Sequence, residues 1–371
     1  MHIVNQCISH RQSHCYANNG VKQSRRRHYP IPDHDHNRFS LIVITSNSHL
    51  RILWRINIDY IYIIIARASP ESARPGRPPR NPLGIFKALM TKRLRQIPSD
   101  RELYQRLWND PTLRMICDIE EREKPYHPSQ LTRFRNRVGP KRLETIIAGL
   151  VEELIQGGLI RGETVAMDAT FIKAYSKRDS RDNRRGTSDP DALVGRDGRT
   201  YGLGYKAHIS ADVDSDLPLA FIVASANEKN HAPGLLDKSV EATGGRVETL
   251  VTDSQYSSRR FREKVADCGV RAVIPYPSNQ AKGEAVLRVD GFFKVYGSEE
   301  ERRLYGLGRS SIERVNSRLE GQVCLDRHRV RGLRNVTIHV ALCIIAMLLV
   351  AVAALRLGVP EKARSIATFG W

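Results

Sequence analysis

The spacing of the apolar residues changes near residue 160, and this change decides which folds the chain can adopt. Between residues 84 and 158 the apolar residues recur with a helical period, most clearly in the amphipathic segment 141–158, which ends at a pair of glycines. Ser99 is placed to cap another helix at 99–110, with Glu102 three residues later as in a capping box. These segments predict a small all-α unit.

After residue 160 the pattern is typical of strands that alternate with helices. Three strand-like runs precede a helix, a fourth strand, a second helix and a short fifth strand. In chain order these expected elements lie at 163–172, 205–213, 217–226, 232–245, 246–256, 259–269 and 270–277. This order predicts an α/β fold in which helices flank a mixed sheet. A polar loop is expected at 177–201, and a helical final part from near Ser310.

The chain before the Pro/Arg-rich hinge at 74–80 has a different composition. Seven of the 12 histidines precede residue 50, where they are mixed with polar and basic residues. We therefore expect residues 1–73 to form a leader that is poorly ordered or does not belong to the native protein. A zinc site near Cys7 is disfavoured, because the candidate ligands His14 and Cys15 are adjacent.

The charge balance limits the partners of the chain. Fifty-nine lysines and arginines against 40 acidic residues give a formal net charge of +19. Such an excess favours a polyanion, either nucleic acid or an acidic membrane surface. The uninterrupted apolar run at 340–355 is shorter than the roughly 18 residues of a spanning helix. A membrane protein is therefore an alternative at this point; the family resemblance given below implies instead that the run is a buried helix and that the chain has no membrane partner. The six scattered cysteines favour a reducing, cytoplasmic compartment.

Two aspartates lie in or beside apolar strands. Asp168 is inside VAMDATF, and Asp253 follows the apolar part of LVTDSQY. A carboxylate in such a place is costly unless a metal or a partner holds it at the rim of the sheet. The alternative is that each residue simply ends a strand and caps the next turn. A third carboxylate could come from the helix at 309–322, where periodicity alone does not decide between Glu313 and Glu320.

Several blocks of residues then make a family resemblance specific. They include MDATFIKAYSKRD, ANEKNHAP, VTDSQYSS, SSIERVNSRLEGQ and LDRHRVRGLRN, in this order. The stretch from about 75 to 358 resembles the DDE-type transposases of bacterial and archaeal insertion sequences, in the branch with a Tyr-Arg-Glu-Lys signature. The resemblance implies a ribonuclease H-like catalytic domain at 159–358, a DNA-binding helical domain at 74–158 and a C-terminal tail at 359–371.

The same resemblance assigns the site residues. Asp168, Asp253 and Glu313 are implied to be the catalytic carboxylates and the metal ligands, with Tyr305, Arg309 and His231 as accessory residues. Two departures from the family pattern stand out. Tyr305 is one residue too far from Arg309, and Glu320 occupies the place of a lysine that is implied to contact DNA. Arg314 or Arg318 could substitute for that lysine.

The implied chemistry is phosphodiester cleavage and strand transfer with two Mg²⁺ ions, for which Mn²⁺ can substitute. The implied partners are double-stranded DNA, both transposon ends and target, and further copies of the chain, in a nucleoid-associated cytoplasmic setting. A catalytically impaired relic that only binds DNA, or a plain ribonuclease H-like nuclease, is the alternative.

Basic residues in two regions are candidates for phosphate contacts, which position a duplex without reading its sequence. A solvated basic helix face is the alternative for the first region. The candidates are Arg133, Arg135, Arg137, Lys141 and Arg142 in the helical part, and Arg318, Arg329 and Arg331 in the C-terminal part.

Overall fold

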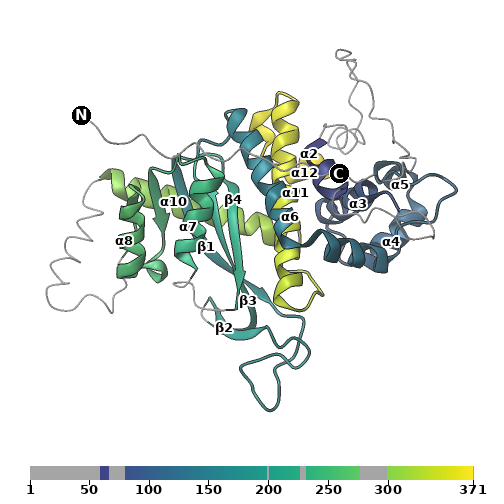
Figure 1. Ribbon diagram of the computed structural model, residues 1–371, viewed down its shortest axis with the longest axis horizontal. Coiled ribbons are helices and arrows are strands. Elements are labelled where there is room, and N and C mark those ends of the chain that lie inside the picture. The colour runs from purple at the N-terminus through teal and green to yellow at the C-terminus, as the bar shows by residue number, and fades with distance from the viewer. Residues whose placement is uncertain (1–58, 67–79, 199, 226–230, 276–298, 371) are drawn as a thin grey trace, which may run out of the picture. The chain divides into compact units, whose positions relative to one another are not determined.

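The computed structural model describes residues 59–66, 80–198, 200–225, 231–275 and 299–370 (Figure 1). The candidate zinc ligands of the leader lie outside these ranges. The described residues all belong to one compact unit. The domain boundaries expected inside it stay predictions.

The N-terminal part of the described chain is helical, as predicted. Its helices are α2 (Asp59–Ala66), α3 (Pro82–Leu94), α4 (Asp100–Asn109), α5 (Pro111–Ile116) and α6 (Pro128–Gln156). The Ser99 hydroxyl caps α4 by accepting a hydrogen bond from the amide of Glu102 at 3.0 Å, so the predicted cap is confirmed. The helix predicted at 141–158 is the second half of α6, which has a kink where Gly139 has φ 70° and Pro140 follows it.

Helix α2 lies within the segment predicted as leader. Its Ile61 and Ile65 are fully buried, and the helix packs against α3 and α6. Burial of two β-branched apolar side chains stabilises this contact. Ile61 and Ile65 are therefore part of the hydrophobic core.

The second part of the chain forms a six-stranded mixed sheet. Its strands are β1 (Thr164–Lys173), β2 (Leu193–Asp197), β3 (Thr200–Asp212), β4 (Leu217–Ala224), β5 (Thr249–Thr252) and β6 (Arg271–Val273). Strand β3 pairs antiparallel with β1, β2 and β4. Strands β5 and β6 continue the sheet parallel to β1. Strands β1 to β4 form the antiparallel part of the sheet and β5 and β6 extend it in parallel, which confirms the expected ribonuclease H-like sheet.

Helices provide the crossovers of the parallel strands. Helix α7 (Ala232–Ala242) connects β4 to β5, and α8 (Arg259–Asp267) connects β5 to β6, at the positions that the sequence predicted. Helix α10 (Glu299–Gly321) packs against β1, β3 and β5 (Figure 1). It begins well before Ser310, where the prediction placed its start. Strand β2, inside the expected polar loop, was also missed.

The two faces of the sheet carry different chemistry, because successive side chains of a strand point to opposite sides. Thr170 of β1 contacts Glu320 of α10, so Asp168, two residues earlier, shares the α10 face. On the other face, Ser210 of β3 accepts a hydrogen bond from Ser239 of α7 at 2.8 Å. The α10 face is therefore the one that bears the candidate carboxylates.

Helix α11 (Leu333–Arg356) contains the long apolar run. It is the one described helix long and apolar enough to cross a membrane, but 94% of its most apolar window is buried inside the protein. It packs against α6, α3 and β4, and lies beside α6 in Figure 1. The predicted buried helix is confirmed. The chain then ends in the short helices η5 (Pro360–Lys362) and α12 (Ile366–Gly370).

Candidate functional site

Asp168 and Asp253 lie on neighbouring strands at the same level of the sheet. Met167 of β1 pairs in parallel with Thr252 of β5. Asp168 is the next residue of β1, and Asp253 directly follows the end of β5. Because paired strands are about 5 Å apart, the two backbones are close at this point. Asp253 also caps the 3₁₀ turn η2 (Ser254–Tyr256), since its Oδ1 accepts a hydrogen bond from the amide of Gln255 at 2.8 Å.

A buried hydrogen bond fixes the turn that carries Asp253. The Tyr256 ring is fully buried, and its hydroxyl lies 3.0 Å from Nδ1 of His208 on β3. His208 is paired with Ala169, the residue after Asp168. The contact therefore ties the segments of both aspartates together beneath the site.

One stripe of α10 faces these aspartates. Tyr305, Arg309 and Glu313 are spaced four residues apart, so their side chains share a helix face. The extra residue between Tyr305 and Arg309 therefore leaves the tyrosine on the same stripe. Gly308 lets the helix approach closely, because a Cβ atom there would lie 2.6 Å from Cγ1 of Val251 on β5.

The Arg309 guanidinium lies between two of the three expected catalytic carboxylates. Its Nη1 is 3.4 Å from Oδ2 of Asp168, and its Nη2 donates to Oε1 of Glu313 at 3.2 Å. The Asp168 side chain is largely buried, at 18% exposure, whereas that of Glu313 is 63% exposed. Arg309 therefore bridges the sheet and the helix, and neutralises part of the negative charge.

Burial dominates the electrostatics of Asp168. It raises the pKa of this carboxyl to about 6, because desolvation disfavours the charged form more than Arg309 favours it. The negative charge of Asp253 acts in the same direction as burial. The amide of Asn316, at 3.5 Å from Oδ2, is a further neighbour on α10. A buried acid with a raised pKa beside a second acid is typical of a functional site.

The donor set suits a hard divalent cation, which takes carboxylate oxygens as ligands. In the described part of the chain, however, no three His, Cys, Asp or Glu side chains are gathered closely enough to hold a metal ion. The exposed Glu313 is instead paired with Arg309.

Glu320 has a different environment. It accepts a short hydrogen bond from the hydroxyl of Thr170, one turn of helix beyond Asn316. The two basic residues expected to replace the family lysine are occupied elsewhere. Arg314 pairs with the buried Asp216 at 2.8 Å, and Arg318 donates a short hydrogen bond to the carbonyl of Asp216. Their guanidinium groups are thus used in folding the β3–β4 turn onto α10.

His231 lies on the other side of the sheet from Arg309. It precedes α7, and its ring is 5.2 Å from that of His208, between ring centroids. Burial lowers the pKa of both imidazoles, that of His208 to about 3. His231 therefore lies beside His208, which holds the turn of Asp253 through Tyr256. The accessory role of His231 stays a prediction.

The predicted DNA-binding residues differ in how free they are. Arg133 and Arg137 are exposed on α6, whereas Arg135 is paired with Asp100 at 2.6 Å. Arg142 donates to backbone carbonyls just before the kink of α6. Arg331 lies over the ring of Tyr175, at 5.0 Å from its centroid. Arg135 and Arg142 thus have structural partners, which their sequence spacing did not reveal.

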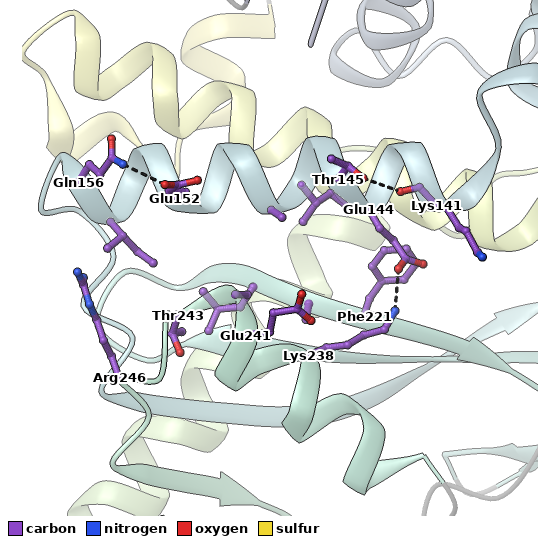
Figure 2. A pocket seen from close by; sticks show the side chains of 17 residues that line it. Lys141, Glu144, Thr145, Glu152, Gln156, Phe221, Lys238, Glu241, Thr243 and Arg246 are labelled. Atoms are coloured by element: carbon purple, nitrogen blue, oxygen red, sulfur yellow. Dashed lines mark hydrogen bonds and ion pairs between the residues drawn. The ribbon is translucent and has the colours of Figure 1, made fainter. Parts of the chain in front are cut away.

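Lys141 lies at the rim of a cavity of about 720 Å³ between α6, α7 and β4 (Figure 2). The Lys238 side chain reaches across it to Glu144, at 2.9 Å, over the ring of Phe221. Three basic and three acidic side chains line this cavity, namely Lys141, Lys238, Arg246, Glu144, Glu152 and Glu241. Their charges balance, so the cavity has no preference for a polyanion.

Sequence analysis missed several neighbours of the carboxylates. Thr170 and Asn316 are next to Asp168 in space, and His208 and Tyr256 support the strand ends. Thr170 has a sequence signal, since it follows Asp168 by two residues and so shares its strand face. Asn316 follows Glu313 by three residues and so shares its helix face.

Comparison with known proteins gives two family matches. A family model described as "Transposase DDE domain" matches residues 161–349, just over half of the chain. A second, described as "Transposase domain (DUF772)", matches residues 43–137 and so begins inside the predicted leader. The curated proteins include no match.

Solved structures give weaker likenesses. The piggyBac transposase synaptic complex with hairpin DNA is 11% identical over 88% of this chain and 77% of that chain, with a TM-score of 0.42. The Mos1 transposase paired-end complex with the left transposon end is 10% identical over 69% and 83%, with a TM-score of 0.21. The simian T-cell lymphotropic virus intasome in complex with PP2A regulatory subunit B56 gamma is 16% identical, with a TM-score of 0.22. The match to the intasome spans 49% of this chain and 56% of the chain from that complex.

The family models match directly, and the first of them covers Asp168, Asp253 and Glu313. These matches show that the chain belongs to the transposase DDE domain family.

Proposed function

We propose that this chain binds the ends of its insertion sequence, cleaves the DNA there and joins it to a target. The main support is the relation of three carboxylates. Asp168 and Asp253 directly follow Met167 and Thr252, which are paired between β1 and β5. Glu313 is linked to Asp168 through Arg309. Asp168 faces the helix turns between Arg309 and Asn316. This favours Glu313, which lies between them, over Glu320 as the third carboxylate.

The proposed metal ligands are Asp168, Asp253 and Glu313. The family resemblance implies divalent metal ions, and carboxylate oxygens suit Mg²⁺ or Mn²⁺. When bound, a pair of such ions supplies an activated attacking oxygen and a stabilised leaving oxygen for an in-line displacement.

Arg309 has a role that follows from its own contacts. Its guanidinium holds Asp168 and Glu313 on one side of the sheet and reduces their mutual repulsion. The buried contact between Tyr256 and His208 keeps the turn of Asp253 at the same level. These contacts thus hold the segments of Asp168 and Asp253 at one level of the sheet and leave Glu313 on the facing helix.

The proposed partner is double-stranded DNA, bound by several copies of the chain in the nucleoid. The net charge of +19 provides the attraction. Arg133 and Arg137 on α6, with Arg329 before α11, are exposed and available for phosphate contacts. Such contacts make affinity fall steeply with salt.

A cleavage and joining assay tests the proposal. The full chain is incubated with Mg²⁺ and DNA that carries the inverted repeats flanking its coding sequence. We expect Asp168→Asn, Asp253→Asn and Glu313→Gln to lose cleavage by roughly 100-fold or more while they keep DNA binding. Glu320→Gln is the matched control on the same helix, and we expect it to retain cleavage.

The outcomes separate the alternatives. Cleavage without joining would identify a plain nuclease, and DNA binding without cleavage by the unchanged chain would identify a relic. Loss of cleavage in Glu320→Gln with activity in Glu313→Gln would show that the third carboxylate is wrongly assigned.

A further inference from the structure

A second cavity, of about 480 Å³, lies between α3, α6 and the segment that leads into α11. Its lining is strongly basic, whereas that of the cavity in Figure 2 is balanced. The basic residues are Lys92, Arg93, Arg135, Arg327, Arg329 and Arg331, and the only acidic residue among those that line it is Asp100. This excess of positive charge is the first indication of an anion site.

The carboxylate of Asp100 is already fully used. Its Oδ1 accepts from Nζ of Lys92 at 2.6 Å and its Oδ2 from Nη2 of Arg135 at 2.6 Å. Although burial opposes it, these two cations hold the pKa of Asp100 below its usual range. The single negative charge of Asp100 is therefore shared by Lys92 and Arg135. It does not balance the charge of another cation in the cavity.

Arg93 is that third cation. It is only 5% exposed, and no carboxylate among the described residues forms an ion pair with it. Its Nη2 contacts Nδ1 of His339 at 2.8 Å, and Nε2 of His339 lies 2.9 Å from the carbonyl of Leu325. Because a carbonyl accepts, Nε2 carries the proton, and Nδ1 accepts from Arg93. The imidazole is thus neutral and does not balance the guanidinium.

Two further observations agree with an uncompensated charge. The Nε atom of Arg93 is buried without a hydrogen-bond partner. Burial, followed by repulsion from Arg93, lowers the pKa of Lys92 to about 8 even though Asp100 is in contact with it. A buried cation without an anion is costly, which is why buried charges are normally paired.

We propose that this cavity binds a phosphate group, with Arg93 at its floor and Arg327 and Arg329 at its rim. Guanidinium groups present forked donors that match the oxygens of a phosphate. The proposal that the phosphate belongs to the DNA backbone rests on the proposed function. Binding of a free phosphate or nucleotide has the same chemistry and does not depend on it.

The first experiment tests the phosphate site without DNA. Thermal unfolding of the full chain is measured in inorganic phosphate and in chloride at equal ionic strength. We expect saturating phosphate to raise the Tm by roughly 2–4 °C. The rise should vanish in Arg93→Gln and shrink in Arg327→Gln, which is exposed and not at risk of misfolding. It should persist in Arg122→Gln, an exposed control outside the cavity.

The second experiment identifies the source of the phosphate. The affinity for a DNA duplex is measured over a range of salt concentrations. If the cavity holds a backbone phosphate, Arg327→Gln reduces the slope of log affinity against log salt by about 1, and inorganic phosphate competes. A phosphate-dependent Tm rise with an unchanged slope would assign the site to free phosphate or a nucleotide.

The proposal fails if phosphate stabilises the chain no more than chloride does. It also fails if Arg122→Gln loses the effect as Arg327→Gln does, since the stabilisation would then reflect overall charge. Neither result depends on DNA cleavage, so failure here is distinct from failure of the proposed function.

Discussion

Replacing Asp168 by Asn removes a charge whose burial is unfavourable. The pKa of this carboxyl rises from 3.8 to about 6 on folding. A difference of about 2 units corresponds to about 3 kcal/mol, at about 1.4 kcal/mol per unit. The side chain is only 18% exposed, so solvent screening reduces this figure little. In the absence of divalent cations, we expect Asp168→Asn to be about 3 kcal/mol more stable than the unchanged chain at pH 7.5.

The pH dependence has a definite sign. The folded protein binds the proton more tightly than the unfolded chain does, because the pKa is higher in the folded state. The unchanged chain therefore loses stability as pH rises from 3.8 to about 6. Above about pH 6 the stability difference between the unchanged chain and Asp168→Asn should stay constant. Below pH 3.8 the two should be about equally stable.

Urea unfolding in EDTA at several pH values measures the effect. Asp214→Asn is a suitable control, because its side chain is 52% exposed and 3.7 Å from Arg161. We expect this exposed pair to contribute no more than about 1 kcal/mol. Adding Mg²⁺ should stabilise the unchanged chain and narrow its difference from Asp168→Asn. A destabilised Asp168→Asn, or a gain that does not change between pH 4 and 7, would refute the reasoning.

Three further substitutions test the packing. Gly308→Ala should lower the free energy of unfolding by about 1–3 kcal/mol, because its Cβ would lie 2.6 Å from Val251. Adding Val251→Ala to this variant should restore part of the lost stability, as measured by urea titration. If the second substitution restores none of it, the clash is not the cause. Asp216→Asn should cost about 2 kcal/mol, since Arg314 and Arg364 lose their partner but are half exposed. Those two arginines lower the pKa of Asp216 despite its burial, so its contribution is present at neutral pH and is lost in acid, and a difference that grew as pH fell would contradict this. Leu348→Ala should lower the free energy of unfolding by about 2–5 kcal/mol, measured by calorimetry or urea titration, because this side chain of α11 is fully buried. A smaller loss would mean that the surrounding side chains move to fill the cavity.

The order of strands and helices could be predicted because periodicity depends on which faces are buried. The strand at 164–173 alternates between two covered faces, and the kink at Gly139 follows from a Gly-Pro pair. Strand β2 was missed because LVGRD is short and has only two apolar residues, so its pairing with β3 leaves little periodic signal. The start of α10 was missed because Gly306 and Gly308 read as helix breakers, whereas Gly308 provides the close contact with Val251.

The candidate site could be predicted only in part. The positions of Asp168, inside one apolar run, and Asp253, just after another, follow from the sequence, and the proximity of the two strands follows from the sheet order. The ion pairs of Arg309 do not follow from spacing, because they depend on the side-chain rotamers and on the approach of α10 to β1. The uncompensated Arg93 was also hidden, since its neighbours His339 and Leu325 are more than 200 residues away in sequence.

Helix α11 has one side against α6 and α3 and another against β4. The helical part and the sheet therefore both pack against the same apolar helix. Removing either part would expose one side of that helix to solvent. Heating or denaturant should consequently melt both together in one cooperative step. If the chain changes conformation to bind DNA, we expect loops and side chains to move while the helical part and the sheet stay together.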